Sequence, residues 1–286
     1  MIYGLVWPMS EEELVYPSKE WAITFREAGF THIRMDLPVM RDRANAEASV
    51  QIMIDAGLNV FPILSWPVGE PDTEAMQGYA RWYVERFPGT EWVELGNEPW
   101  ILYKTHGWEY LRVAKPMAEA LEEADPNVKV VLAMDLFDHV DGNERGWPGV
   151  DEIIEFIAAS PRRYADLHPY RNPYRATYSP WGSRDFEYNA ICDRLGHDRF
   201  VYGEVGWKPS EGKYQASGEY HIQELDIDAH HKIPMVCIYT HIADLINPEF
   251  DFGLWVAESQ TEVRPSPAAT AISEYLLGDP DACREV

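Results

Sequence analysis

The chain has 286 residues, of which 46% are hydrophobic and 25% charged, a composition that excludes wholesale disorder and allows a full hydrophobic core. Its 24 basic and 48 acidic residues give a net charge of −24, so we expect neither nucleic acid nor an anionic membrane as a partner. Three cysteines without a CxxC spacing indicate neither a disulfide framework nor a zinc site. The first residues lack the basic region of a signal peptide, and no apolar stretch reaches the length of a membrane span. These features fit either a cytoplasmic protein or an excised secreted domain, and they indicate no oligomeric state.

Short apolar runs typical of β-strands alternate with helix-like segments along the chain. The runs lie at 2–7, 31–37, 59–66, 91–96, 128–134, 164–170, 200–207 and 234–241. Such alternation predicts a parallel sheet with right-handed crossovers, and eight units are what a closed (β/α)8 barrel needs. The alternative, an open doubly wound sheet, usually carries a glycine-rich phosphate loop, and neither GxGxxG nor GxxxxGK[ST] occurs. We therefore predict an α/β fold, with residues 1–286 forming a single catalytic TIM barrel domain.

In a (β/α)8 barrel, the functional side chains come from the C-terminal ends of the strands. Glu98 follows the fourth predicted strand, and Glu204 lies in the second half of the seventh. The other candidates for substrate contact at strand ends or in the following loops are Arg34, Asn97, His168, Tyr170, Tyr239, Trp7, Trp66, Trp100, Trp207 and Trp255. Two carboxylates can cleave a glycosidic bond, because one protonates the leaving oxygen while the other attacks the anomeric carbon or activates water. Tryptophan faces suit the C–H-rich face of a pyranose.

Two segments carry a resemblance to a known group of enzymes. Residues 93–99, Val-Glu-Leu-Gly-Asn-Glu-Pro, resemble the Asn-Glu-Pro signature of clan A glycoside hydrolases, and residues 201–207 resemble the strand of that clan that carries the nucleophile. The resemblance implies that Glu98 is the acid/base and Glu204 the nucleophile. Arg34 and the His-x-Tyr pattern at His168 are similar to family 5, whereas Glu94 and the Tyr239 segment are similar to family 39, so no family is assigned.

These features predict a retaining glycoside hydrolase that cleaves β-glycosidic bonds by double displacement, with its two carboxyl groups about 5–5.5 Å apart. Short loops after most strands favour endo action on a polysaccharide or oligosaccharide. We expect Arg34 to orient Glu204, and Glu94 to be a structural carboxylate inside the barrel. Asn97 is expected to donate to the sugar 2-hydroxyl. The negative charge of Glu204 is expected to raise the pKa of Glu98.

Two other functions remain open at this stage, namely a transglycosylase with the same catalytic pair and a non-catalytic glycan-binding barrel. No cofactor is implied, and the absence of HExxH and HxH motifs from the sequence argues against a metal site. Arg171, Arg175 and Arg184 follow the sixth strand in a strongly acidic chain. They either pair with the protein's own acids or recognise a carboxylate or sulfate on an anionic glycan.

Overall fold

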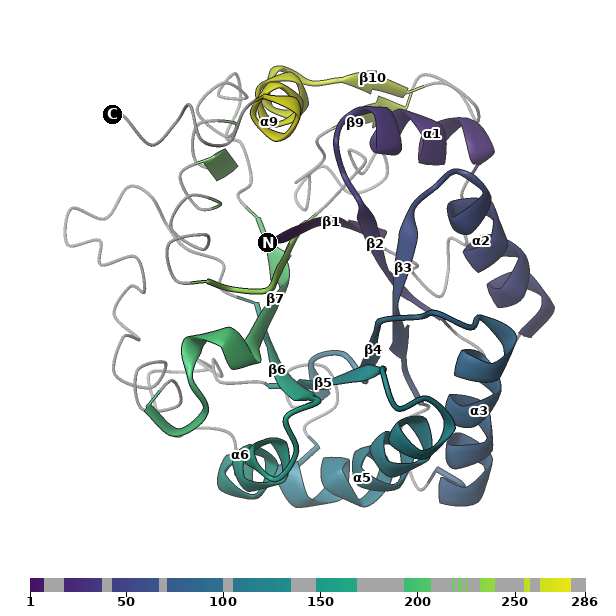
Figure 1. Ribbon diagram of the computed structural model, residues 1–286, viewed down its shortest axis with the longest axis vertical. Helices are drawn as coiled ribbons and strands as arrows, with labels where there is room; N and C mark the ends of the chain where they lie inside the picture. The colour runs from purple at the N-terminus through teal and green to yellow at the C-terminus, as the bar shows by residue number, and fades with distance from the viewer. Residues whose placement is uncertain are drawn as a thin grey trace.

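The computed structural model describes residues 1–7, 18–37, 43–66, 71–99, 105–134, 148–168, 193–206, 218, 221–222, 225, 232–239, 255–257 and 263–278. Eight parallel strands follow one another around a closed barrel, and the last pairs with the first (Figure 1). They are β1 (Ile2–Trp7), β2 (His32–Asp36), β3 (Asn59–Leu64), β4 (Trp92–Leu95), β5 (Lys129–Ala133), β6 (Arg163–Leu167), β7 (Phe200–Val205) and β8 (Met235–Ile238). The predicted TIM barrel is confirmed.

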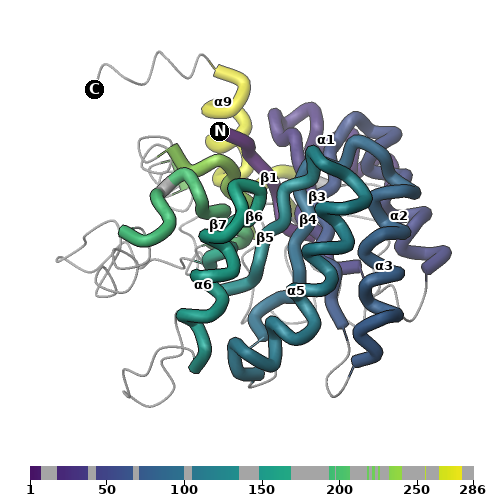
Figure 2. The backbone as a smooth tube through the Cα atoms, turned by 60° about the horizontal axis from the view of Figure 1, so that its bottom comes forward, coloured from purple at the N-terminus to yellow at the C-terminus, as the bar shows by residue number. Residues whose placement is uncertain are grey.

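Helices line the outside of the barrel, as the turned view of Figure 2 shows for α2, α3 and α5. The described helices are α1 (Lys19–Glu27), α2 (Arg43–Asp55), α3 (Thr73–Arg86), α5 (Gly107–Ala124), α6 (Val150–Ala158), the 3-10 helix η2 (His197–Arg199) and α9 (Pro267–Leu277). Polar caps start several of them. Ser18, for example, accepts a 3.1 Å hydrogen bond from the N–H of Trp21, which satisfies a donor that the first helical turn leaves open. Among these elements, no helix is long and apolar enough to cross a membrane.

The alternation of side chains along each strand separates two apolar layers. The inner layer fills the barrel with Val6, Phe61, Trp92, Val131, Val201, Met235 and Cys237. The outer layer lies between the strands and the helices. At the closing pair of strands, Gly4 of β1 is in register with Cys237 of β8. A Cβ on Gly4 would come within 2.7 Å of the Cys237 sulfur, so the smallest residue lets the barrel close here.

Two tryptophans that we predicted as sugar platforms belong to this outer layer instead. Trp7 is 1% exposed, and its ring centroid lies 5.9 Å from that of Trp21 on α1. Trp255 begins β9 (Trp255–Ala257), which pairs with β10 (Val263–Pro265) in a separate antiparallel ribbon. It is also 1% exposed and packs 5.0 Å from Phe25, between ring centroids. Because neither ring presents a face to solvent, the prediction was wrong for both.

Candidate active site

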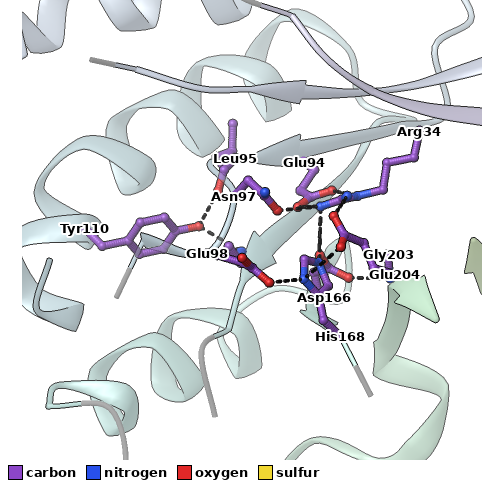
Figure 3. Close-up of polar contacts among 11 residues, drawn as sticks. Arg34, Glu94, Leu95, Asn97, Glu98, Tyr110, Asp166, His168, Gly203 and Glu204 are labelled. Carbon is purple, nitrogen blue, oxygen red and sulfur yellow. Dashed lines mark hydrogen bonds and ion pairs between the residues drawn. The ribbon is translucent and has the colours of Figure 1, made fainter. Parts of the chain in front are cut away.

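Ionisable side chains from four strands converge inside one end of the barrel (Figure 3). They come from β2, from β4 and the residues after it, from β6 and the residue after it, and from β7. These residues are Arg34, Glu94, Glu98, Asp166, His168 and Glu204. Their clustering at the carboxyl ends of parallel strands is the arrangement expected of a barrel active site.

Arg34 is the fully buried centre of this cluster. Its Nε and Nη2 donate to the two carboxylate oxygens of Glu94 at 2.6 and 2.7 Å, and its Nη1 donates to Oε1 of Glu204 at 2.7 Å. Nη2 also donates to Oδ1 of Asn97 at 2.9 Å. Burial would lower the pKa of Arg34, but the surrounding carboxylates raise it well above its usual value. Arg34 thus contacts both Glu204 and Glu94, and the roles that we predicted for Arg34 and Glu94 stay predictions.

The backbone that presents Glu98 has an unusual conformation. Gly96 and Glu98 both have positive φ angles, 73° and 42°, and such angles are uncommon for a residue with a side chain. A neighbouring phenol supports the end of β4, because the Tyr110 hydroxyl donates to the carbonyl of Leu95 at 2.6 Å. The same hydroxyl accepts from the N–H of Ala133 on β5 at 3.0 Å. Beyond this end of β4, Oε1 of Glu98 lies 2.8 Å from Nδ1 of His168 (Figure 3).

Asp166 is a site residue that our reading of the strand ends missed. Asp166 is 1% exposed, and its Oδ2 lies 2.9 Å from Nε2 of His168. Its other oxygen accepts a 2.6 Å hydrogen bond from the N–H of Gly203, directly before Glu204. A signal was present in the sequence, since an aspartate within the apolar strand Tyr-Ala-Asp-Leu needs a buried partner.

The pKa of Glu98 is shifted in the direction opposite to our prediction. Burial raises it, but the hydrogen bond and the positive charge of His168 outweigh burial, so the pKa is lowered. Burial would lower the pKa of His168, yet Glu204 and Asp166 raise it well above the usual value. Burial also raises the pKa of Glu94, and Arg34 opposes this only in part. The sequence did not indicate that the His168 imidazole lies between the carboxylates.

The remaining predicted substrate contacts divide into described and undescribed residues. Trp66 is half-buried, and its ring stacks on Tyr110 with 5.6 Å between centroids. Tyr239 is half-buried and packs against the inner layer of the barrel. The predictions for Trp100, Tyr170, Trp207, Arg171, Arg175 and Arg184 lie outside the described residues.

The same side chains offer closely spaced metal-ligand atoms. Glu98, His168 and Glu204 each place one such atom within 4.8 Å of the other two. A cation there would compete with the Arg34 guanidinium, 2.7 Å from Glu204, and with the hydrogen bond between His168 and Glu98. Positive charge is therefore already supplied by the chain, and the arrangement does not fit a metal centre.

Comparisons with known proteins relate the fold to solved glycosidases. No protein-family model and no curated protein matches the chain. Among solved structures, XacCel5A aligns with a TM-score of 0.68 at 10% identity, over 96% of this chain and 98% of that one. A GH5 family lichenase from Caldicellulosiruptor sp. F32 aligns with a TM-score of 0.65 at 14% identity, over 96% and 92%.

Cel5A of Thermotoga maritima, solved with cellobiose, aligns with a TM-score of 0.63 at 13% identity, over 95% of this chain and 97% of that one. The same protein was also solved with mannotriose. At such low identities, these alignments establish the shared barrel fold. The resemblance to family 39 is not confirmed by them.

Proposed function

We propose that this protein is a retaining glycoside hydrolase that cleaves β-glycosidic bonds, with Glu204 as nucleophile and Glu98 as acid/base. The observation that carries the proposal is the spacing of the two carboxylates. One oxygen of Glu98 and one of Glu204 lie within 4.8 Å of each other. Retaining enzymes hold their carboxyl groups about 5–5.5 Å apart, whereas inverting enzymes leave about 6.5–9.5 Å for a water molecule. The close approach supports direct attack by one carboxylate.

The surroundings of the two glutamates support their different roles. Glu204 is 8% exposed and bound to the guanidinium of Arg34, which matches the negative charge that a nucleophile carries. The Glu98 side chain is 22% exposed and hydrogen-bonded to His168, a group that can itself carry a proton. An acid/base must exchange a proton in both steps of the reaction, so a titratable neighbour suits Glu98 better than a permanent cation would.

The substrate class that we propose is a β-linked polysaccharide or oligosaccharide cut internally. The similar barrels include a lichenase and a Cel5A solved with cellobiose and mannotriose, so glucans and mannans are the first substrates to test. The double-displacement cycle forms a glycosyl ester on Glu204 while Glu98 protonates the leaving oxygen. Water, activated by Glu98, then releases the product.

The decisive experiment traps the covalent intermediate. The protein would first be assayed on β-glucans and mannans, with mass spectrometry of released oligosaccharides. It would then be incubated with an activated 2-deoxy-2-fluoro glycoside of the preferred sugar. We expect a stable adduct on the peptide that contains Glu204 and no adduct in the Glu204→Ala variant. An adduct on another residue would refute the assignment, and failure to cleave any glycan would favour a binding barrel.

A further inference from the structure

Asp166 is a buried carboxylate whose two oxygens serve different partners. Oδ1 accepts from the N–H of Gly203 at 2.6 Å, next to Glu204 on β7. Oδ2 lies 2.9 Å from Nε2 of His168, whose Nδ1 lies 2.8 Å from Oε1 of Glu98. A Cβ on Gly203 would come within 2.4 Å of Oδ1, so glycine permits this close approach. Asp166 therefore connects the backbone beside one glutamate to the imidazole that contacts the other (Figure 3).

The hydrogens of Arg34 indicate which imidazole nitrogen is protonated. Nη2 carries two hydrogens, and the oxygens of Glu94 at 2.7 Å and Asn97 at 2.9 Å accept them. The longer 3.3 Å approach of Nη2 to Nε2 of His168 is thus not needed to satisfy Arg34. An ionised carboxylate can only accept, so the 2.9 Å contact from Asp166 to Nε2 places a hydrogen on Nε2. Asp166 thereby selects the tautomer of His168.

We propose that Asp166, His168 and Glu98 form a proton relay, in which Asp166 keeps Nε2 protonated so that Nδ1 and Glu98 can exchange a single proton. Asp166 is a positioning residue in this scheme, because it acts through His168. The proposal rests on the glycosidase function proposed above. It adds how Glu98, the acid/base of that site, receives its proton and receives it again after each catalytic cycle.

The relay accounts for every proton of the double displacement. The shared proton rests on Nδ1 and moves along the 2.8 Å hydrogen bond to Oε1 of Glu98, which leaves His168 neutral. Glu98 gives this proton to the leaving oxygen as the C1–O bond breaks and a Glu204 oxygen bonds to C1. Water then attacks C1, the bond to Glu204 breaks, and Glu98 takes a proton from that water. The proton returns to Nδ1, so the relay regains its starting charge.

The charges that face His168 favour this resting state. Glu98 faces it from the end of β4, Glu94 from β4 within 4.8 Å, and Asp166 from β6. Glu204 faces it from β7 at 3.7 Å, and Arg34 from β2 at 3.3 Å. Burial would lower the pKa of His168, but the carboxylates raise it well above the usual value. The pKa of Glu98 is lowered in turn by His168, despite burial. The shared proton is therefore held by the imidazole until the reaction draws it to Glu98.

Asp166→Asn tests the relay with nearly unchanged volume. The new amide can still accept from Gly203, but its NH2 group would face Nε2 and select the tautomer with the hydrogen on Nδ1. Glu98 then loses its proton source, so kcat/KM should fall roughly 100-fold on unactivated oligosaccharides. A dinitrophenyl glycoside needs no acid to expel its leaving group, so its glycosylation step should change by less than about 5-fold. Equal losses on both substrates would indicate a merely structural role and overturn the relay.

The pH profile supplies a second readout. Because Asp166 stabilises the imidazolium, its removal should move the alkaline limb of kcat/KM on oligosaccharides to lower pH by about 1 unit or more. Asp151→Asn is the matched control, since it makes the same chemical change at an exposed salt bridge to Arg194. We expect neither its substrate ratio nor its pH profile to change. An unshifted alkaline limb in Asp166→Asn would refute the relay.

A third readout does not depend on activity. In 15N-histidine-labelled protein, NMR should show His168 doubly protonated at neutral pH and titrating well above pH 6.5. In Asp166→Asn it should be neutral, with the proton on Nδ1. A hydrolase whose His168 is neutral at neutral pH would overturn the relay while the proposed function stands. A protein that hydrolyses no glycan but shows this titration would overturn the function instead.

Discussion

Replacing Arg34 with methionine should leave the Glu94 carboxylate buried in the barrel without its counter-ion. Glu94 is 0% exposed, and its two oxygens accept hydrogen bonds of 2.6 and 2.7 Å from Arg34. Removing one partner of a buried ion pair costs about 3–5 kcal/mol, because the remaining charge keeps its desolvation penalty. Arg34→Met should therefore lower the free energy of unfolding by about this amount at pH 8, measured by urea titration.

The pH dependence of that loss identifies its cause. Burial already raises the pKa of Glu94 in the wild type, and removing Arg34 raises it further. A folded carboxyl with a raised pKa binds its proton more tightly than the unfolded one, so its folding penalty shrinks as pH falls below the folded pKa and is gone only below the unfolded pKa. The deficit of Arg34→Met should thus be clearly smaller at pH 5 than at pH 8. Adding Glu94→Gln should recover part of the stability at pH 8. If the loss of unfolding free energy is equal at both pH values and the double variant recovers none of it, an unpaired Glu94 charge is not its cause.

Four further outcomes follow from the site. Glu98→Ala should lose activity on polysaccharide, retain more on aryl glycosides with good leaving groups and regain turnover with azide. Glu204→Ala should lose activity on both kinds of substrate. Steady-state kinetics on the two kinds of substrate distinguish the two variants. Trp66→Ala should raise KM for oligosaccharides about 3- to 10-fold, the value of one lost stacking contact, with kcat little changed. If Arg171 and Arg175 recognise an anionic glycan, their alanine variants should raise KM for uronic or sulfated substrates and remove its salt dependence. Dialysis against EDTA should leave hydrolysis unchanged, because the Arg34 guanidinium already supplies the positive charge beside Glu204.

The fold was accessible from the sequence because each strand is a short apolar run between helical segments. All eight barrel strands overlap the ranges predicted for them. Glu98 and Glu204 could be singled out because each interrupts or ends such a run. Burying a charged group there costs free energy, so its presence indicates a partner or a function. Whether they are catalytic remains the proposal made above.

Side-chain direction was harder to predict than strand position. Trp7 lies at the end of β1, where a shift of one residue exchanges the inner and outer faces of the sheet. Its neighbour Val6 points into the barrel and Trp7 packs on α1. The pKa of Glu98 was missed for a related reason, since His168 comes from another strand and only the closed barrel brings the two together.

The closing pair of strands has a consequence for how the chain acquires its structure during synthesis. Gly4 of β1 meets Cys237 of β8, so one edge of β1, the first strand synthesised, stays unpaired until β8 has been made. Contacts so distant in the chain form slowly, and an unpaired strand edge can recruit another polypeptide in the meantime. A growing chain that stops before residue 235 exposes two such edges, at β1 and β7. Chaperone capture of the chain before β8 is complete should therefore raise the yield of folded protein.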